Sequence, residues 1–196
     1  PTVHTARGDL VAENIVLATG AAVLDRGLYF AKVSAMRSYA VAFAVPDEVA
    51  LPEGMFLSAD APSRSVRTVS DRDGRWEQTR LIVGGGGHSV GRAASELARV
   101  AELIAWTRRH VPDAVPTHRW SAQDYTSHNL VPFVGVMPRT GGRVRFATGY
   151  AKWGLTNGPA AALRIAAEIE GIGEGGRAEW MRRLGTRITV PADVAE

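Results

Sequence analysis

Thirteen residues, from Ala147 to Pro159 (Ala-Thr-Gly-Tyr-Ala-Lys-Trp-Gly-Leu-Thr-Asn-Gly-Pro), combine a cation, an aromatic ring and glycines in one short segment. Because glycine has no Cβ, the backbone at Gly149, Gly154 and Gly158 can approach a flat or anionic ligand closely. Lys152 would add a positive charge there. The segment therefore indicates a ligand-binding turn, although glycine-rich turns also join strands to helices without binding anything.

The elements on either side would position this turn. Residues 144–147 are predicted to form a short strand, and residues 159–170 an alanine-rich helix. Asn157 or Gly158 would cap that helix, and Gly171 would end it. The free N–H groups and the positive dipole end of the helix would then point back at the turn, where they favour a negative ligand atom.

A second pattern has a different chemistry. Gly87-His88-Ser89-Val90-Gly91 matches G-x-S-x-G, follows an apolar run at 81–83 and precedes a predicted helix, as a hydrolase nucleophile elbow requires. The remaining members of a triad would come from Asp113, Asp124, His118 and His128. Against this, several glycines separate the predicted strand from Ser89, and the neighbouring strands look antiparallel. A flexible glycine and serine loop is the alternative.

The composition excludes several classes of site. The chain has 196 residues, 45% of them apolar, and a net charge of only +3, so a dedicated nucleic-acid surface is not expected. It has no cysteine, hence no disulfide, thiolate metal site or iron-sulfur ligand, which fits a cytoplasmic location. The five histidines lack metal-ligand spacing, so no metal site is predicted. No apolar run reaches the roughly 18 residues that cross a bilayer.

The middle of the chain is predicted to be a largely antiparallel sheet with one crossing helix. Apolar runs at 39–45, 55–59, 65–69 and 80–83 indicate strands, residues 71–74 a hairpin turn, and residues 92–110 a helix. A short helix is predicted near residues 177–184, followed by a polar tail. The fold class is therefore α+β.

Several passages resemble, in order, the carboxyl-terminal half of the D-amino-acid oxidase-like (DAO) superfamily of FAD-dependent oxidoreductases, which includes glycine oxidases, sarcosine oxidases and members fused to a Rieske domain. The passages are Val3–Gly8 with Ala12–Gly20, which ends in A-T-G; Trp120–Thr126, similar to W-x-x-Q-D-x-T; Leu130–Gly135, similar to x-x-P-x-I-G; and the glycine-rich turn. The resemblance covers most of residues 1–170.

The resemblance implies non-covalent FAD and oxidation of a C–N bond of an amine or amino-acid-like substrate. Lys152 stands where family members carry an arginine that binds the substrate carboxylate, and Arg67 is a second candidate for an anion contact. Lysine keeps the charge but lacks the bidentate fork of arginine, which puts an α-amino-acid substrate in doubt. The cofactor-binding residues implied are Thr19, Gly20, Gly149, Trp153, Gly154, Leu155, Thr156 and Asn157, the last three through backbone N–H groups.

The G-x-G-x-x-G fingerprint that holds the FAD pyrophosphate in this family does not occur in the sequence. The chain is therefore expected to be a fragment whose FAD site is completed by a missing N-terminal FAD-binding segment, and to be inactive by itself. An electron-transfer domain is a further expected partner. The expected parts are 1–30 and 119–171 in the FAD domain, 31–118 as the substrate-binding sheet with its helix, and 172–196 as a tail. A non-catalytic substrate-binding or interaction module is the alternative.

Overall fold

The computed structural model describes residues 1–69 and 79–185, which form two compact units. The first unit contains residues 1–35 and 124–196, and the second contains residues 36–123. The hairpin turn predicted at 71–74 and the tail beyond residue 185 lie outside the described residues. The division of the chain into an FAD part and a substrate part stays a prediction.

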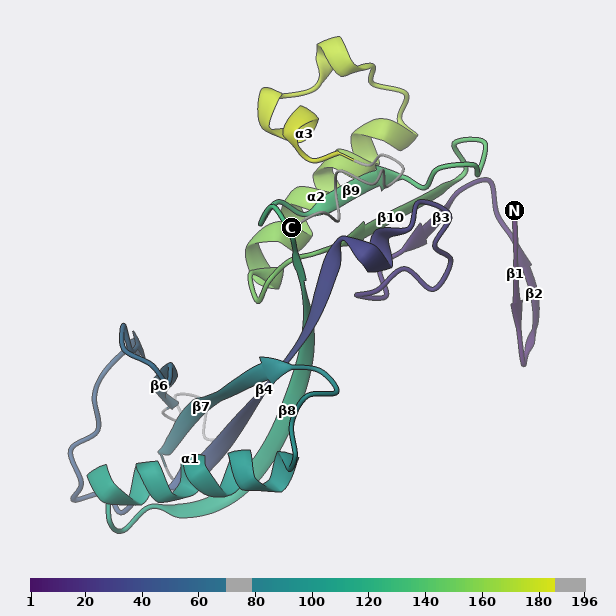
Figure 1. The fold of residues 1–196 in the computed structure, drawn as a ribbon. Helices are drawn as coiled ribbons and strands as arrows, with labels where there is room; N and C mark the ends of the chain where they lie inside the picture. The colour runs from purple at the N-terminus through teal and green to yellow at the C-terminus, as the bar shows by residue number, and fades with distance from the viewer. Residues whose placement is uncertain (70–78, 186–196) are drawn as a thin grey trace. The chain divides into compact units, whose positions relative to one another are not determined.

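The second unit is built on a five-stranded sheet with the order β5-β6-β7-β4-β8 (Figure 1). The neighbouring pairs β5/β6, β6/β7 and β4/β7 are antiparallel, as the sequence predicts. The strands are β4 (Val33–Ala44), β5 (Met55–Leu57), β6 (Arg64–Val69), β7 (Arg80–Ser89) and β8 (Val115–Ser127).

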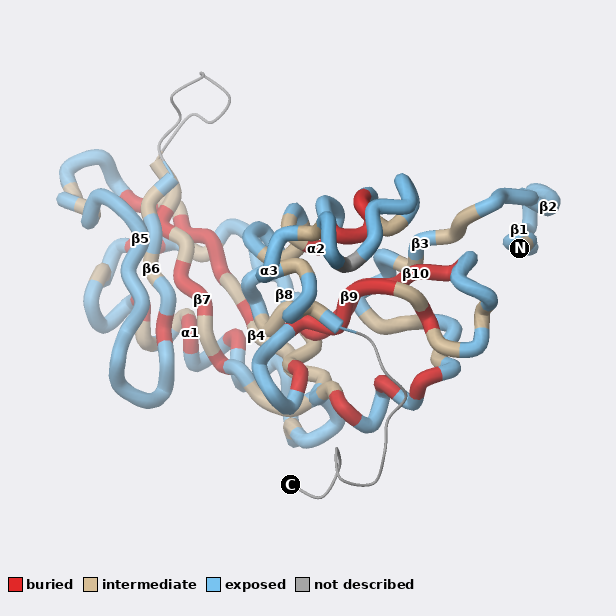
Figure 2. The backbone as a smooth tube through the Cα atoms, turned by 90° about the horizontal axis from the view of Figure 1, so that it is seen from above, coloured by how far each residue is buried: buried red, intermediate tan, exposed pale blue. Residues whose placement is uncertain are grey.

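Helix α1 (Glu96–His110) packs against one face of this sheet, and the buried stretches of β4, β7 and α1 are drawn in red in Figure 2. Alternate residues of β4 and β7 point toward the helix because successive side chains of a strand face opposite sides. They form a core with residues of α1: Tyr39, Val41, Phe43, Leu81, Val83, Val100 and Leu103. The helix begins at Glu96 rather than at Arg92, because the side chain of Ser95 accepts a hydrogen bond from the Ala98 amide and caps it.

The glycine run is part of strand β7 rather than a loop after it. Gly84 stands opposite Ser65 of β6 and Ala40 of β4, and a Cβ on Gly84 would lie 2.5 Å from the Ser65 hydroxyl oxygen. Gly85 has a φ of +158°, and a Cβ there would lie 2.9 Å from the Ser63 carbonyl oxygen. Glycine therefore lets the neighbouring strands approach closely. The sequence alone had suggested a flexible loop at this position.

The first unit contains a three-stranded sheet with the order β3-β10-β9 and a separate hairpin. β3 (Ile15–Leu17) is parallel to β10 (Val144–Thr148), whereas β9 (Phe133–Val136) is antiparallel to it. The hairpin pairs β1 (Thr2–Thr5) with β2 (Gly8–Val11). Helix α2 (Gly154–Ile169) packs on the sheet through Ala161 and Ile165, and Gly171 ends it with a φ of +76°, as predicted. The short helix α3 (Glu179–Arg183) confirms the helix predicted near the end of the chain.

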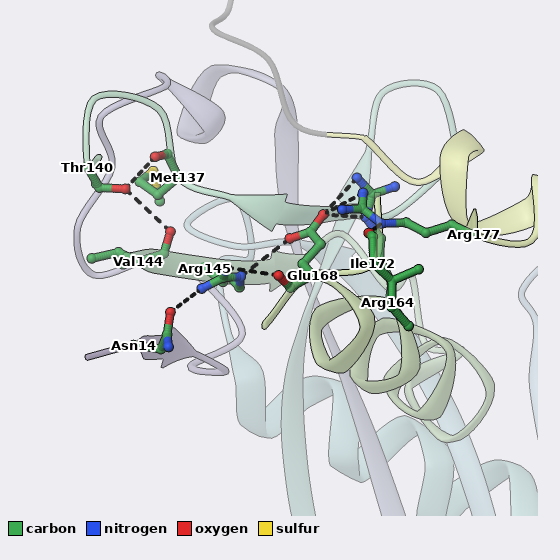
Figure 3. A network of polar contacts seen from close by, with 9 residues as sticks. All are labelled: Asn14, Met137, Thr140, Val144, Arg145, Arg164, Glu168, Ile172 and Arg177. Atoms are coloured by element: carbon green, nitrogen blue, oxygen red, sulfur yellow. Dashed lines mark hydrogen bonds and ion pairs between the residues drawn. The ribbon is translucent and has the colours of Figure 1, made fainter. Parts of the chain in front are cut away.

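A buried cluster of charges joins the sheet, α2 and the segment after it (Figure 3). Only 6% of the Glu168 side chain is exposed, and its carboxylate forms ion pairs with Arg145 at 3.5 Å, Arg164 at 3.1 Å and Arg177 at 3.5 Å. Arg145 also donates to the Asn14 side chain, at 2.6 Å, just before β3. One carboxylate is therefore the shared ion-pair partner of three guanidinium groups.

Replacing Glu168 by glutamine is expected to destabilise the protein by about 3–5 kcal/mol, because the buried guanidinium groups would lose their counter-charge. Urea denaturation measures the change. Glu170→Gln is the matched control, since Glu170 is exposed at the end of the same helix and should change stability by less than about 0.5 kcal/mol. Equal effects of the two substitutions would show that the charge cluster contributes little.

Candidate functional site

The glycine-rich turn is shorter than the sequence predicts, because α2 begins at Gly154 instead of Pro159. Residues 149–153 alone connect β10 to α2, so Gly154 and Gly158 belong to the helix. Three of these connecting residues have left-handed backbones: Gly149 at a φ of +83°, Ala151 at +46° and Lys152 at +71°. A positive φ is uncommon for residues that carry a Cβ, and such strain often occurs at ligand-binding positions.

Hydrogen bonds from the end of β8 hold this strained turn. The Ala151 amide donates to the Tyr125 carbonyl oxygen at 3.0 Å, and Thr126 forms a β-bridge with Tyr150. The Trp153 amide donates to the Tyr150 carbonyl oxygen at 2.8 Å, and the Asn157 side chain donates to the same oxygen at 3.3 Å. The turn is therefore fixed from both β8 and α2.

Gly149 permits the close approach of β8. A Cβ on Gly149 would lie 3.1 Å from the Ser127 Cβ, and its φ is left-handed. Any other residue would therefore be strained here and would have to displace β8 by a few tenths of an ångström.

The N-terminus of α2 leaves two backbone donors open to a ligand. Trp153 precedes the helix without a side-chain capping bond, and the first turn contains no acidic residue. The amides of Gly154 and Leu155 donate to no group in the described part of the chain, whereas those of Thr156 and Asn157 both donate to the Trp153 carbonyl oxygen, at 3.1 and 2.8 Å. The Thr156 and Asn157 amides are therefore already hydrogen-bonded within the helix start, and their contact with FAD stays a prediction. The side chains of Trp153 and Leu155 are 69% and 97% exposed.

The structure brings the A-T-G segment to the same edge of the sheet. Because β3 and β10 are parallel, the residues after both strands lie at one end. The Thr148 hydroxyl donates to the Gly20 carbonyl oxygen, and Gly20, with a φ of +77°, lies against the Tyr125 ring. Thr19 bonds the carbonyl oxygen of Ala21. Arg67 is exposed on β6 of the second unit, directly opposite Ile82.

Asp124 is a candidate that the sequence suggested only as a partner of Ser89. It lies on β8, just before the residues that hold the turn, and its Oδ1 atom is buried without a hydrogen-bond partner in the described part of the chain. Burial raises the pKa of the Asp124 carboxyl, and the charge of Lys152 lowers it by a smaller amount. Burial also raises the pKa of Tyr150. The charge of Lys152 therefore acts on the Asp124 carboxyl at this site.

Ser89 does not occupy a nucleophile elbow. It is the last residue of β7, which is antiparallel to β4, and α1 begins only at Glu96. Its hydroxyl contacts the Met36 sulfur at 3.6 Å. The neighbouring His88 is hydrogen-bonded to the Tyr39 hydroxyl at 2.9 Å and to the Ser89 carbonyl oxygen at 2.8 Å, so both of its ring nitrogens are occupied. This arrangement contradicts the hydrolase interpretation.

Within residues 1–69 and 79–185, no three acidic or histidine side chains gather closely enough to hold a metal ion. No helix in these ranges is both long and apolar enough to cross a membrane.

Comparison with known proteins gives one family for most of the chain. The family described as FAD dependent oxidoreductase (DAO) matches residues 1–168. The putative Rieske 2Fe-2S iron-sulfur protein YhfW of Bacillus subtilis (strain 168) is 29% identical over 145 residues, which cover 74% of this chain and 27% of that protein.

Solved structures share the fold of almost the whole chain. Glycine oxidase from Geobacillus kaustophilus matches with a TM-score of 0.69 and 19% identity, over 96% of this chain and 48% of that enzyme. L-proline dehydrogenase from P. horikoshii matches with a TM-score of 0.65 and 15% identity, over 95% of this chain and 51% of that enzyme. The chain thus spans about half the length of these enzymes and about a quarter of YhfW.

Asp124→Asn is expected to raise the free energy of unfolding at neutral pH. Because burial raises the folded-state pKa of this carboxyl above its ordinary value of 3.8, the stability it contributes is fully present below that value and is lost as the pH rises through the folded pKa. Asparagine does not ionise, so the gain should be present at neutral pH and vanish below about pH 3. Urea denaturation at both pH values tests this, with exposed Asp113→Asn as the control. A loss of stability at neutral pH would contradict the assignment.

A fluorophosphonate probe is expected to leave Ser89 unmodified in the folded protein, because both ring nitrogens of the neighbouring His88 are hydrogen-bonded to other groups and the Ser89 hydroxyl contacts the Met36 sulfur. Peptide mass spectrometry detects the adduct, and Ser89→Ala gives the background. Labelling of the wild-type peptide above that background would restore the hydrolase interpretation.

Proposed function

The chain belongs to the DAO family of FAD-dependent oxidoreductases, and we propose that it is part of an enzyme that oxidises a C–N bond of an amine or amino-acid-like substrate. FAD is the cofactor of this family. The observation that carries the proposal is the meeting of the A-T-G segment and the strained turn at the carboxyl ends of β3 and β10. Ligands of sheets with parallel strands commonly bind at this edge.

The residues at this edge fit the cofactor. The open amides of Gly154 and Leu155, together with the positive end of α2, suit the edge of a flavin ring, which gains negative charge on reduction. Gly149 allows the backbone to come close, and exposed Trp153 offers an apolar face. Thr19 and Gly20 would lie at the adenosine-phosphate end of the cofactor. Thr156 and Asn157 would shape the helix start through their bonds to Trp153.

When bound, FAD supplies an acceptor for a hydride, and the protein supplies binding and charge. Lys152 would hold an anionic group of the substrate or compensate the charge of the reduced ring. Arg67 lies on β6 of the second unit and stays a predicted anion contact, and we assign that unit to substrate binding. The absence of cysteine is consistent with non-covalent FAD binding.

We also propose that the FAD site is completed by an N-terminal segment outside this sequence. The chain contains no G-x-G-x-x-G fingerprint and spans about half the length of the glycine oxidase that shares its fold. By itself the chain would then be inactive. The similarity to a protein named as a Rieske iron-sulfur protein supports an electron-transfer domain as a partner that reoxidises the flavin. A cytoplasmic location stays a prediction.

Cofactor binding gives the first test. We expect the purified complete protein to retain the visible absorption of FAD after unbound FAD is removed. This chain alone should be colourless, since it lacks the G-x-G-x-x-G segment that would bind the FAD pyrophosphate. A colourless complete protein would overturn the proposed function. A yellow chain would contradict only the need for the missing segment.

Lys152→Met is expected to lower kcat/KM of the complete enzyme about 10- to 100-fold, the range for losing one charge-assisted hydrogen bond of about 1.5–3 kcal/mol. Steady-state oxidation of the substrate measures this. Lys152→Arg is the matched control, because it keeps the charge and should retain most of the activity. Unchanged kinetics in Lys152→Met, with normal folding, would exclude this role.

A further inference from the structure

We infer that the five-stranded sheet carries, on the face that lies away from α1, a binding site for a small aromatic carboxylate. The site is a cavity of about 300 Å³. Its lining comes from four strands of the second unit: Ala42, Val69, Arg80, Ile82, His118 and Trp120. Because all six residues belong to that unit, the inference does not depend on the proposed function of the turn before α2.

The pairing of the strands brings the lining residues together. Ala42 of β4 stands opposite Ile82 of β7, and Val69 of β6 stands opposite Arg80 of β7. On the other side of β4, the Thr117 hydroxyl donates to the Ala42 carbonyl oxygen at 3.1 Å and ties β8 to its neighbour. The cavity therefore follows from contacts between adjacent strands of one sheet.

Alternation along the strands decides which side chains reach this face. Val41 and Phe43 pack against α1, so Ala42 between them points to the opposite face. Ile82 of β7 likewise lies between two residues of the same core. Because the Ala42 side chain is a single methyl group, the longer side chains of β7 and β8 form walls on either side of it and leave a hollow over β4.

The apolar part of the lining suits a flat ring. Val69 is 39% exposed and Trp120 is 42% exposed, so both offer apolar surface that is in contact with water. Covering this surface with an apolar ligand is favourable. The Trp120 indole accepts a second ring in a stacked or edge-on arrangement, and His118 of the same strand adds another flat surface. The volume lies at the lower end of the range for small-molecule sites, which suits one ring or two fused rings.

The charge of the lining selects an anion. Arg80 contributes a guanidinium group, and none of the six described lining residues is acidic. A guanidinium has five N–H donors, so Arg80 can bind a ligand carboxylate alongside a protein partner. Hydrogen bonds between a guanidinium and a carboxylate are strong because both groups are charged. An apolar ring with one carboxylate therefore matches both the apolar walls and the cation.

A second copy of this chain matches the cavity less well. Two copies that met through this face would place Arg80 against the same arginine of the partner, and like charges across an interface are unfavourable. The small volume of the cavity also favours a small molecule over a protein surface.

Binding of matched ligands to the complete protein tests the inference. Calorimetry would compare 2-naphthoate with its neutral analogue 2-naphthamide, which lacks the charge, and with acetate, which lacks the ring. 2-Naphthoate should bind at least ~10-fold more tightly than either, since each analogue loses one of the two kinds of contact. Absence of 2-naphthoate binding, or equal binding of 2-naphthoate and either analogue, would overturn the inference.

Two variants of the lining separate the charge from the ring. Arg80→Met should weaken 2-naphthoate by ~10-fold and leave 2-naphthamide unchanged, because the guanidinium contacts only the carboxylate. Unchanged binding of 2-naphthamide also shows that this variant folds. Trp120→Leu, which keeps an apolar side chain but removes the indole, should weaken both ring ligands together. Full affinity for 2-naphthoate in both variants would overturn the inference.

Two control variants locate the ligand. Arg119→Met removes the same charge from an exposed residue of β8 that does not line the cavity, and Lys152→Met removes the cation of the turn. Neither should change the affinity for 2-naphthoate. An equal loss in Arg119→Met and Arg80→Met would indicate a general effect of charge, and a loss in Lys152→Met would place the ligand at the turn. Either result would overturn the inference and leave the proposed function standing.

Discussion

The parallel pairing of β3 with β10 is the constraint on which the first unit depends. It joins Ile15 to Val144 across most of the length of the chain, so ordering it costs a large loop-closure entropy. Polar contacts fix both ends of the pair. Arg145 bonds Asn14 at one end, within the Glu168 cluster, and Thr148 bonds Gly20 at the other, where the A-T-G segment meets the end of β10. The buried charge cluster and the candidate site thus lie at opposite ends of the β3/β10 pair.

The left-handed turn at that end persists because several hydrogen bonds to neighbouring segments hold its backbone. Ala151 and Lys152 would each relax to negative φ in isolation, but the bonds from Ala151 to Tyr125 and from Trp153 and Asn157 to Tyr150 leave no such freedom. The amides of Ala151 and Trp153 donate in these bonds, so the backbone N–H groups that stay open are those of Gly154 and Leu155. The strain of the turn and the open amides therefore both follow from the way β8 runs along the turn.

The sequence predicted the strands that contain apolar runs and missed a strand without that signal. β4 contains an apolar run and several buried residues, so the sequence predicts it as a strand. β8 is polar and mostly exposed over thirteen residues, so no hydrophobic pattern marks it as a strand. The start of α2 was misplaced because Asn157 and Gly158 are good caps and Trp153 is not, yet the bonds to Tyr150 start the helix at Gly154. The buried oxygen of Asp124 depends on distant neighbours, which no local pattern encodes.

The distribution of cations shows what the protein uses each type for. Around Glu168 it uses arginines, whose planar guanidinium groups reach the carboxylate and nearby carbonyl oxygens in fixed directions, as Arg145 and Arg177 do. At the turn it uses lysine, a compact charge on a flexible stem that cannot fix a carboxylate in a bidentate geometry. A site that relies on Lys152 alone would recognise charge but hardly orientation.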